Sequence, residues 1–396
     1  MGQLVPTPSQ PPLGTSSPAV AGPRWLFPAT AAAVIALHAI LLAASPGVHG
    51  GADLLAHLRM VELMGVAPAL RNVYPPAYHL LGALLSPVVG LAAYPKLFAV
   101  GATAISIGCF RFFQRRAGLP DHTAVLFALW PYSFTLSWSM PKIEVAGYAL
   151  VFLGLGLLMA RRHVWLALVL GASFWVHTPG ALLLGLCGGV LALARRDARG
   201  LAALALGALG AAPLIGSHLA AGCSLQQALL FEEGDYLHIA SLRSSMHRWP
   251  LFLALASPPT LLAAIAGAPA VWTRDRALAA LCGVLVVLYL QELWLAPFGA
   301  GTTVNLNRGL SLLVVPVAIS AGVWLAPRPR LAPWVLGAAA LWCVACAVTV
   351  AREPISWRPV ALEEIRDLRM ARCRFGWSAP HAAHRKDRRP RAPARR

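Results

Sequence analysis

Charged residues, and acidic residues above all, are scarce in this chain of 396 residues. Asp and Glu together number 15 and charged residues make up 12% of the chain, whereas hydrophobic residues make up 58%. Together with a mean hydropathy of +0.65, this balance excludes an ordinary soluble domain. Hydrophobic runs of roughly 20 residues between short charged links instead predict an all-α fold, a polytopic bundle of transmembrane helices.

Metal-binding and disulfide-forming patterns of cysteine are also missing. The seven cysteines show no Cys-x-x-Cys or Cys/His spacing, and most of them lie inside apolar runs, where a thiol behaves as a small hydrophobic group. The sequence therefore predicts neither a disulfide framework nor a zinc cluster.

The excess of positive charge, +18, does not indicate a nucleic-acid partner. It lies in arginine pairs between apolar runs and in a basic tail that can meet anionic lipid headgroups. We predict three regions: a disordered leader rich in Pro, Ser and Thr (1–23), a transmembrane domain (24–350) whose first span is a retained signal anchor, and a basic, disordered tail (351–396).

Eleven transmembrane spans are predicted from the apolar runs. Their expected ranges are 25–44, 96–113, 122–139, 143–160, 164–176, 180–194, 201–221, 250–272, 277–296, 308–326 and 331–350. A twelfth apolar segment, 77–94, is interrupted by Pro87 and Gly90 and is either a further span or an interfacial helix.

Charge favours the interfacial alternative for 77–94. All the arginine pairs, from Arg115-Arg116 to Arg328 and Arg330, then fall on one side, which the positive-inside rule identifies as the cytoplasm. With eleven spans the basic tail falls on the outer side, which the positive-inside rule does not favour. Because the Ala, Arg and Pro content is typical of a GC-rich bacterium, we expect a multi-pass protein of the bacterial inner membrane, surrounded by membrane lipids and with its active site facing outward.

Ionisable groups gather just after the first span. In a membrane protein such groups are costly to bury, so they usually face a water-filled cavity or have a function. Asp53 and His57 are one helical turn apart and share a helix face, so they could form an oriented base or two metal ligands. Tyr74 precedes two prolines that predict a turn, and His79 follows. The alternatives are a helix cap for Asp53 and a simple interfacial role for the histidines.

The runs 164–176 and 180–194 form a short hairpin, broken at His177-Thr178-Pro179-Gly180. At about 1.5 Å per residue, the first run covers roughly 20 Å of a hydrocarbon core about 30 Å thick. Polar backbone at such depth must line protein or water, so we expect a water-filled hollow on the outer side of this hairpin.

The order of these parts, over roughly residues 25–325, resembles the C-type (GT-C) glycosyltransferases. These integral membrane enzymes include protein O-mannosyltransferases and lipid A aminoarabinose transferases. The resemblance implies interfacial helices in the first outer loop and a polyprenyl-phosphate-linked sugar donor. It also implies transfer of the sugar to a lipid, glycan or protein acceptor on the non-cytoplasmic face.

The resemblance implies roles for individual residues as well. Asp53 stands where the family carries the acidic group that orients or deprotonates the acceptor, with His57 beside it. Glu144 stands near a second acidic position that helps to bind a divalent metal ion in several branches, so Asp53 and Glu144 are the implied metal ligands. His177 occupies the break where relatives carry a Thr-Lys-Gly-like segment, and Arg308 opens a late span as do arginines that contact the lipid phosphate.

Transfer from a lipid phosphate needs a base for the acceptor and positive charge on the leaving phosphate. Candidates for binding the phosphate or the substrate are Lys142, Arg243, Arg248, Arg308, Tyr74 and His79. The chain departs from the family in lacking an Asp-x-Asp or Glu-x-Asp pair in the first loop and the Trp-Trp-Asp-Tyr-Gly acceptor motif of oligosaccharyltransferases. Protein N-glycosylation is therefore disfavoured.

Two other functions compete with the glycosyltransferase. A transporter or flippase for a lipid or polar solute would also suit the broken hairpin and the intramembrane Glu292. Against it, the sequence halves show no repeat and the ionisable groups gather on one side. The third alternative is a membrane scaffold without catalysis.

Overall fold

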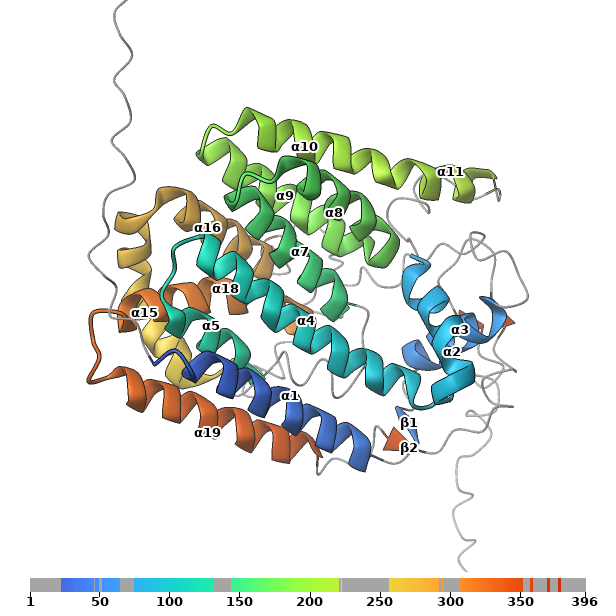
Figure 1. The fold of residues 1–396 in the computed structure, drawn as a ribbon, viewed down its shortest axis with the longest axis horizontal. Coiled ribbons are helices and arrows are strands. Elements are labelled where there is room, and N and C mark those ends of the chain that lie inside the picture. The colour runs from blue at the N-terminus through green and yellow to red at the C-terminus, as the bar shows by residue number, and fades with distance from the viewer. Residues whose placement is uncertain are drawn as a thin grey trace, which may run out of the picture.

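A computed structural model describes residues 23–45, 47–49, 52–64, 75–131, 144–220, 222, 256–291, 294, 306–351, 357–358, 369–370 and 377–378. Within these residues the chain is a bundle of α-helices, and the strands are two-residue segments only (Figure 1). The all-α prediction is confirmed for this part of the chain. The leader 1–22 and most of the tail lie outside the described residues.

The first part of the chain builds one long helix, a pair of short helices and a second long helix. The elements are α1 (Leu26–Ala44), β1 (Val48–His49), α2 (Ala52–Met64), α3 (Ala77–Val89), α4 (Tyr94–Arg116) and α5 (Asp121–Ala128). Gly90 follows α3 with φ +87°, a conformation that glycine adopts without a Cβ clash, and it turns the chain into α4.

Three helical hairpins follow, and aspartate caps begin two of their helices. The elements are α7 (Glu144–Met159), α8 (His163–Val176), α9 (Thr178–Ala194), α10 (Ala198–Ala208), the 3-10 turn η2 (Leu209–Ala211), α11 (Ala212–Ala220), α15 (Pro258–Arg274) and α16 (Arg276–Tyr289). Asp197 accepts a hydrogen bond from the backbone N–H of Gly200, and Asp275 accepts from those of Ala277 and Leu278. These short polar side chains satisfy amide groups that a helix start leaves open.

The chain ends with two long helices and short strands: α18 (Leu306–Leu325), α19 (Ala332–Ala351), β2 (Trp357–Arg358), β3 (Arg369–Met370) and β4 (Trp377–Ser378). α18 lies in the middle of the bundle and packs on α5, α15 and α16. Its backbone comes so close to α15 that a Cβ on Gly267 would lie 2.0 Å from the carbonyl oxygen of Ser320, so this crossing requires glycine.

Each of the eleven predicted spans coincides with a described helix or part of one. Four helical segments are long and apolar enough to cross a membrane: Leu26–Ala44, Tyr94–Arg116, Ala198–Ser217 and Ala332–Thr349. Such helices are expected of a membrane protein. The other apolar helices are shorter in the part that was searched, which for α18 is Ser311–Leu325. α5 covers only the beginning of the predicted span 122–139, whose residues after 131 lie outside the described part. The number of eleven crossings therefore stays a prediction.

The arginine pairs gather at one end of the bundle, which we call the basic end and define by the turns α4–α5, α7–α8, α9–α10, α15–α16 and α18–α19. Arg195 forms an ion pair with Asp275 at 2.6 Å, which joins two of these turns. Arg274 reaches back to the carbonyl of Gly118, and His163 contacts Asp197 at 3.0 Å. This arrangement is the one that the interfacial alternative for 77–94 predicts.

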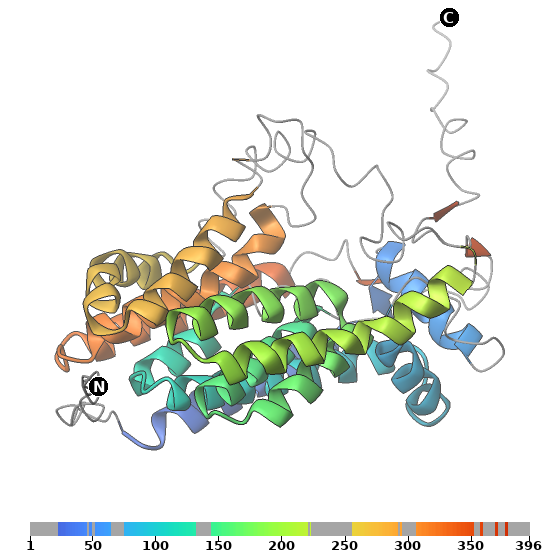
Figure 2. The same cartoon turned by 90° about the horizontal axis from the view of Figure 1, so that it is seen from above.

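The opposite end of the bundle holds α2 and α3 (Figures 1 and 2). The Nζ of Lys96, in the first turn of α4, donates to the carbonyl of Ser45, just after α1, at 2.7 Å. The chain thus leaves α1 and enters α4 at the same end, and the 13-residue helix α3 precedes α4 at that end (Figure 1). β1 and β2 pair next to this point, so the tail also begins at the end away from the arginine pairs, as the count of eleven spans predicts.

Candidate functional site

Two buried histidines meet between α2 and α3 at the end opposite the basic end. The Nδ1 of His57 lies 3.0 Å from the Nε2 of His79, within hydrogen-bond distance. Exposure of the two residues is 8% and 0%. Most buried polar side chains are hydrogen-bonded, and this contact joins α2 to α3.

Aromatic rings enclose the pair. The ring of Tyr78 meets both imidazoles edge to face, at 5.7 Å from His57 and 5.4 Å from His79 between centroids. The Tyr94 hydroxyl donates to the carbonyl of Tyr78, which ties the beginning of α4 to α3. Gly82 allows α3 to approach α2 closely, because a Cβ at this position would lie 2.5 Å from the Val61 side chain on α2.

The surroundings of His79 determine its charge. Burial, followed by the nearby His57, holds the pKa of His79 well below its ordinary value of 6.5, although a backbone hydrogen bond with Pro75 acts the other way. In the contact between the two rings either imidazole can donate, according to its tautomer.

His177 forms the break in the hairpin that the sequence predicts. α8 ends at Val176 and α9 begins at Thr178, and the buried Nδ1 of His177 accepts a hydrogen bond from the backbone N–H of Gly180 at 3.1 Å. His177 is thus an N-cap, the alternative to a catalytic role that a break of this kind also allows. A Cβ on Gly147 of α7 would lie 2.4 Å from this Nδ1, so glycine at 147 makes room for the ring.

The two histidine positions belong to one neighbourhood. Val176, the residue before His177, packs against the cluster formed by Val61, Tyr78 and Tyr94. Glu144, half-buried at the first residue of α7, precedes Gly147 by three residues and so lies one turn from the place where His177 is seated. We refer to the part containing His57, His79, His177 and Glu144 as the histidine end.

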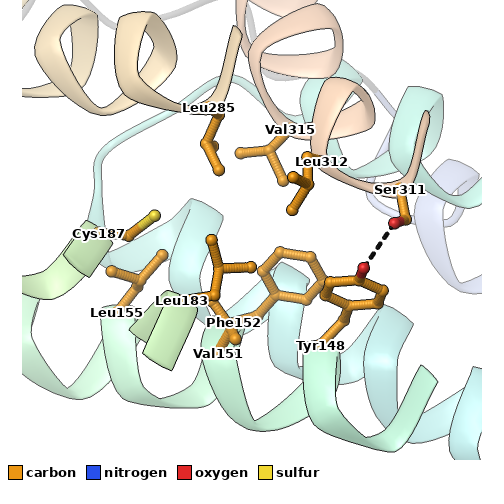
Figure 3. Close-up of a pocket in the computed structure, with 10 residues that line it drawn as sticks. All are labelled: Tyr148, Val151, Phe152, Leu155, Leu183, Cys187, Leu285, Ser311, Leu312 and Val315. Atoms are coloured by element: carbon orange, nitrogen blue, oxygen red, sulfur yellow. Dashed lines mark hydrogen bonds between the residues drawn. The ribbon is translucent and has the colours of Figure 1, made fainter. Parts of the chain in front are cut away.

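A small crevice lies among the helices that follow Glu144. The described residues of α7, α9, α16 and α18 leave an apolar crevice of about 10 Å³, enough for about one water molecule (Figure 3). The hydroxyl groups of Ser311 and Tyr148 form a hydrogen bond of 2.8 Å at one end of it. The rest of its lining is apolar, mostly leucine and valine side chains with Phe152 and Cys187. The water-filled hollow on the outer side of the hairpin stays a prediction, because the loops between α5 and α7 and between α11 and α15 lie outside the described residues.

Several predicted site residues cannot be placed in this geometry. Asp53 lies in α2, one turn before His57, as predicted, and Arg308 lies in the first turn of α18, but their side chains are outside the described part. The following candidates lie wholly outside it: Tyr74, Lys142, Arg243, Arg248 and Glu292. Their roles stay predictions.

The metal site also stays a prediction. Among the described residues, no three His, Cys, Asp or Glu side chains lie close enough together to hold a metal ion. The implied ligand Glu144 is described, and its proposed partner Asp53 is not described at the level of the side chain.

The sequence placed His57 and His79 near the site but did not predict that they bind each other. Their separation of 22 residues spans two helices and a turn, so no helical spacing relates them. Gly82 and Gly147, the residues that admit the rings, were also missed. Each lies one turn after a singled-out polar residue, Gly82 after His79 and Gly147 after Glu144, and this is the signal that could have found them.

Comparison with known proteins gives no further guide to this arrangement. No family model matches the chain, and no curated protein matches it.

Proposed function

We propose that this protein is a membrane glycosyltransferase that moves a sugar from a polyprenyl-phosphate donor to an acceptor at the histidine end. The observation that carries the proposal is the buried contact of His57 with His79 at the end opposite the arginine pairs. Removing two imidazoles from water costs free energy that packing alone would avoid, so the pair is better explained by chemistry than by stability.

The role of each group follows from its place. We assign the Nδ1–H of His57 as the donor to the Nε2 of His79, which leaves the Nε2 of His57 as the basic nitrogen. Asp53 lies one turn earlier on the same helix and would orient or deprotonate the acceptor hydroxyl together with this imidazole. His79 and Tyr78 act as positioning residues, since they hold the His57 ring from the side away from the acceptor.

The leaving phosphate would be stabilised by positive charge. Arg308 begins the helix that passes beside Tyr148, and Lys142 shortly precedes Glu144 along the chain. Both are on the predicted outer side, where a lipid phosphate would be presented. A divalent ion held by Asp53 and Glu144 would supply further charge there, and no step above depends on it.

A second candidate function is a lipid flippase or transporter. A groove of about 720 Å³ between α1 and α19 favours it, because this groove is apolar and bounded by two helices of membrane-spanning length. The polar groups at the histidine end argue for chemistry there, whereas alternating access requires a polar site near mid-depth.

The test replaces Asp53 with Asn in the full-length chain. The variant and the wild type are each returned to cells from which the gene has been deleted, and the glycolipids and surface glycans are compared. We expect a sugar-containing product to be lost on deletion, restored by the wild type and reduced at least about 100-fold with Asp53→Asn, since general-base catalysis contributes that much.

The matched control is Glu62→Gln, which removes a second carboxylate from the same helix. Glu62 is partly exposed and pairs with Arg59 at 2.7 Å, a contact of small energetic value. We expect this variant to restore the product in full. A wild-type level of product with Asp53→Asn would refute the catalytic assignment, and a deletion that changes lipid distribution without changing any glycan would favour the flippase.

A further inference from the structure

A second hollow among the described residues has no part in the chemistry above. It is a groove of about 720 Å³ between α1 and α19, with α5 at its base. Both walls are helices long and apolar enough to cross a membrane. Its lining is apolar apart from Thr30 and His122, and its volume is in the range of sites that bind small ligands.

We propose that this groove binds one acyl chain of an anionic phospholipid from the membrane leaflet at the basic end. α1 and α19 run side by side and both begin at that end (Figure 1). The groove extends over Trp25–Leu37 on α1 and Ala332–Val344 on α19. At about 1.5 Å per residue these stretches are roughly 18 Å long, close to the half-thickness of a hydrocarbon core, about 15 Å.

Charge at the mouth of the groove selects the headgroup. Pro23, Trp25 and Pro329 line the mouth, and the exposed Arg24 and Arg330 are next to them in the chain. In the part of the chain that the structure describes, neither arginine takes part in an ion pair. Two guanidinium groups at the level of the headgroups attract a phosphate diester that carries a net negative charge.

Other occupants fit less well. The leader 1–22 is rich in Pro, Ser and Thr and lacks an apolar run of the length of the groove. A second copy of the chain would have to insert a row of its own side chains between α1 and α19. An acyl chain, by contrast, needs only an apolar groove between the two helices, and the lining provides one.

Gly337 allows a direct test. It lines the groove, and a Cβ placed on it would meet nothing within 4 Å, so a larger side chain fills the groove without disturbing the helices. The matched control is Leu341→Phe, one turn later on α19, where the side chain is 75% exposed and is not part of the groove lining. Both variants and the wild type are purified full-length and equilibrated with mixed phosphatidylglycerol and phosphatidylcholine in detergent.

Native mass spectrometry then counts the lipids retained. We expect the wild type and Leu341→Phe to retain one phosphatidylglycerol per chain, and Gly337→Phe to retain at least about tenfold less. With Arg24→Gln and Arg330→Gln, the preference for phosphatidylglycerol over phosphatidylcholine should fall roughly fivefold for each arginine.

A photoreactive phosphatidylglycerol with a diazirine in its acyl chain gives a measurement that needs no variant. Labelling concentrated on the two groove stretches of α1 and α19 would support the proposal. Equal labelling of the exposed faces of α4 and α10 would overturn it, as would equal retention of lipid by Gly337→Phe and the wild type. If the wild type were a dimer that Gly337→Phe converts to a monomer, the occupant would be a second copy of the chain. If deleting residues 2–22 increased the lipid retained, the occupant would be the leader. Either result would overturn the proposal.

Discussion

The two ends of the bundle hold their polar groups in opposite ways. At the basic end, charged side chains join neighbouring turns through partly exposed contacts, such as Arg195 with Asp275 at 2.6 Å. At the histidine end, neutral rings are buried among aromatic side chains, and His79 has no exposed surface. Exposed ion pairs contribute little to stability, whereas burying polar rings costs free energy unless each finds a partner.

This difference suits two roles: we expect the arginines to orient the chain in the membrane and the histidines to serve the proposed chemistry. The arginines need only be on one side of the membrane to set its topology, so their exact partners matter little. The histidines depend on particular neighbours, including the glycines that let the elements around them approach closely. Substitutions should therefore have large effects at the histidine end and small effects at the basic end.

The largest effect is expected for Gly147→Ala at the histidine end. The added methyl group would overlap the His177 ring, since its distance to Nδ1 would be 2.4 Å. Overpacking and loss of the cap of α9 should together lower the free energy of unfolding by about 2–4 kcal/mol, and transfer activity should fall at least about tenfold. Thermal or denaturant unfolding in detergent and the product assay measure the two effects.

Two controls make this prediction specific. Gly185→Ala in α9 adds the same methyl group where nothing lies within 4 Å, so it should be neutral or stabilising by up to about 1 kcal/mol. His177→Asn keeps a capping side chain and should retain stability. Equal destabilisation by Gly147→Ala and Gly185→Ala would show that the seating of His177 is not required.

The sequence predicted the helices better than the site for a physical reason. Apolar periodicity and arginine pairs are local signals, and they located α1, α4 and α19 within a few residues and correctly placed the break at His177. The contact of His57 with His79 depends on how α2 and α3 are packed, which the spacing of polar residues does not encode.

The second effect is a difference in pH dependence between the ends. The pKa of His79 is held well below 6.5, so the unfolded chain binds more protons than the folded chain below that pH. Stability should fall as the pH is lowered from about 7, by up to about 1.4 kcal/mol per pH unit, until the lowered pKa is reached. His79→Gln should flatten this part of a plot of unfolding temperature against pH.

The basic end should respond in a more acidic range. Burial raises the pKa of Asp197, but its hydrogen bonds with Gly200 and His163 outweigh this and leave the pKa below its ordinary value of 3.8. The stability that this carboxylate contributes is present above that value and lost as the pH falls through the lowered pKa. Asp197→Asn should leave the slope near pH 6 unchanged. If it removed that slope and His79→Gln did not, the assignment of the two pH ranges to the two ends would be wrong.

The smallest effect is expected for Arg195→Gln, which removes one ion pair at the basic end. About one third of each partner's side chain is exposed, at 35% for Arg195 and 27% for Asp275, so the contact should contribute less than about 1 kcal/mol and weaken further in salt. Asp275 still caps α16 through its other oxygen, and the neighbouring arginines still mark the side of the membrane. Unfolding temperature, measured at low and high salt, should change by only a few degrees, and product formation should equal that of the wild type. A loss of activity comparable to that of Gly147→Ala would mean that the two ends are coupled, and that the basic end does more than orient the chain.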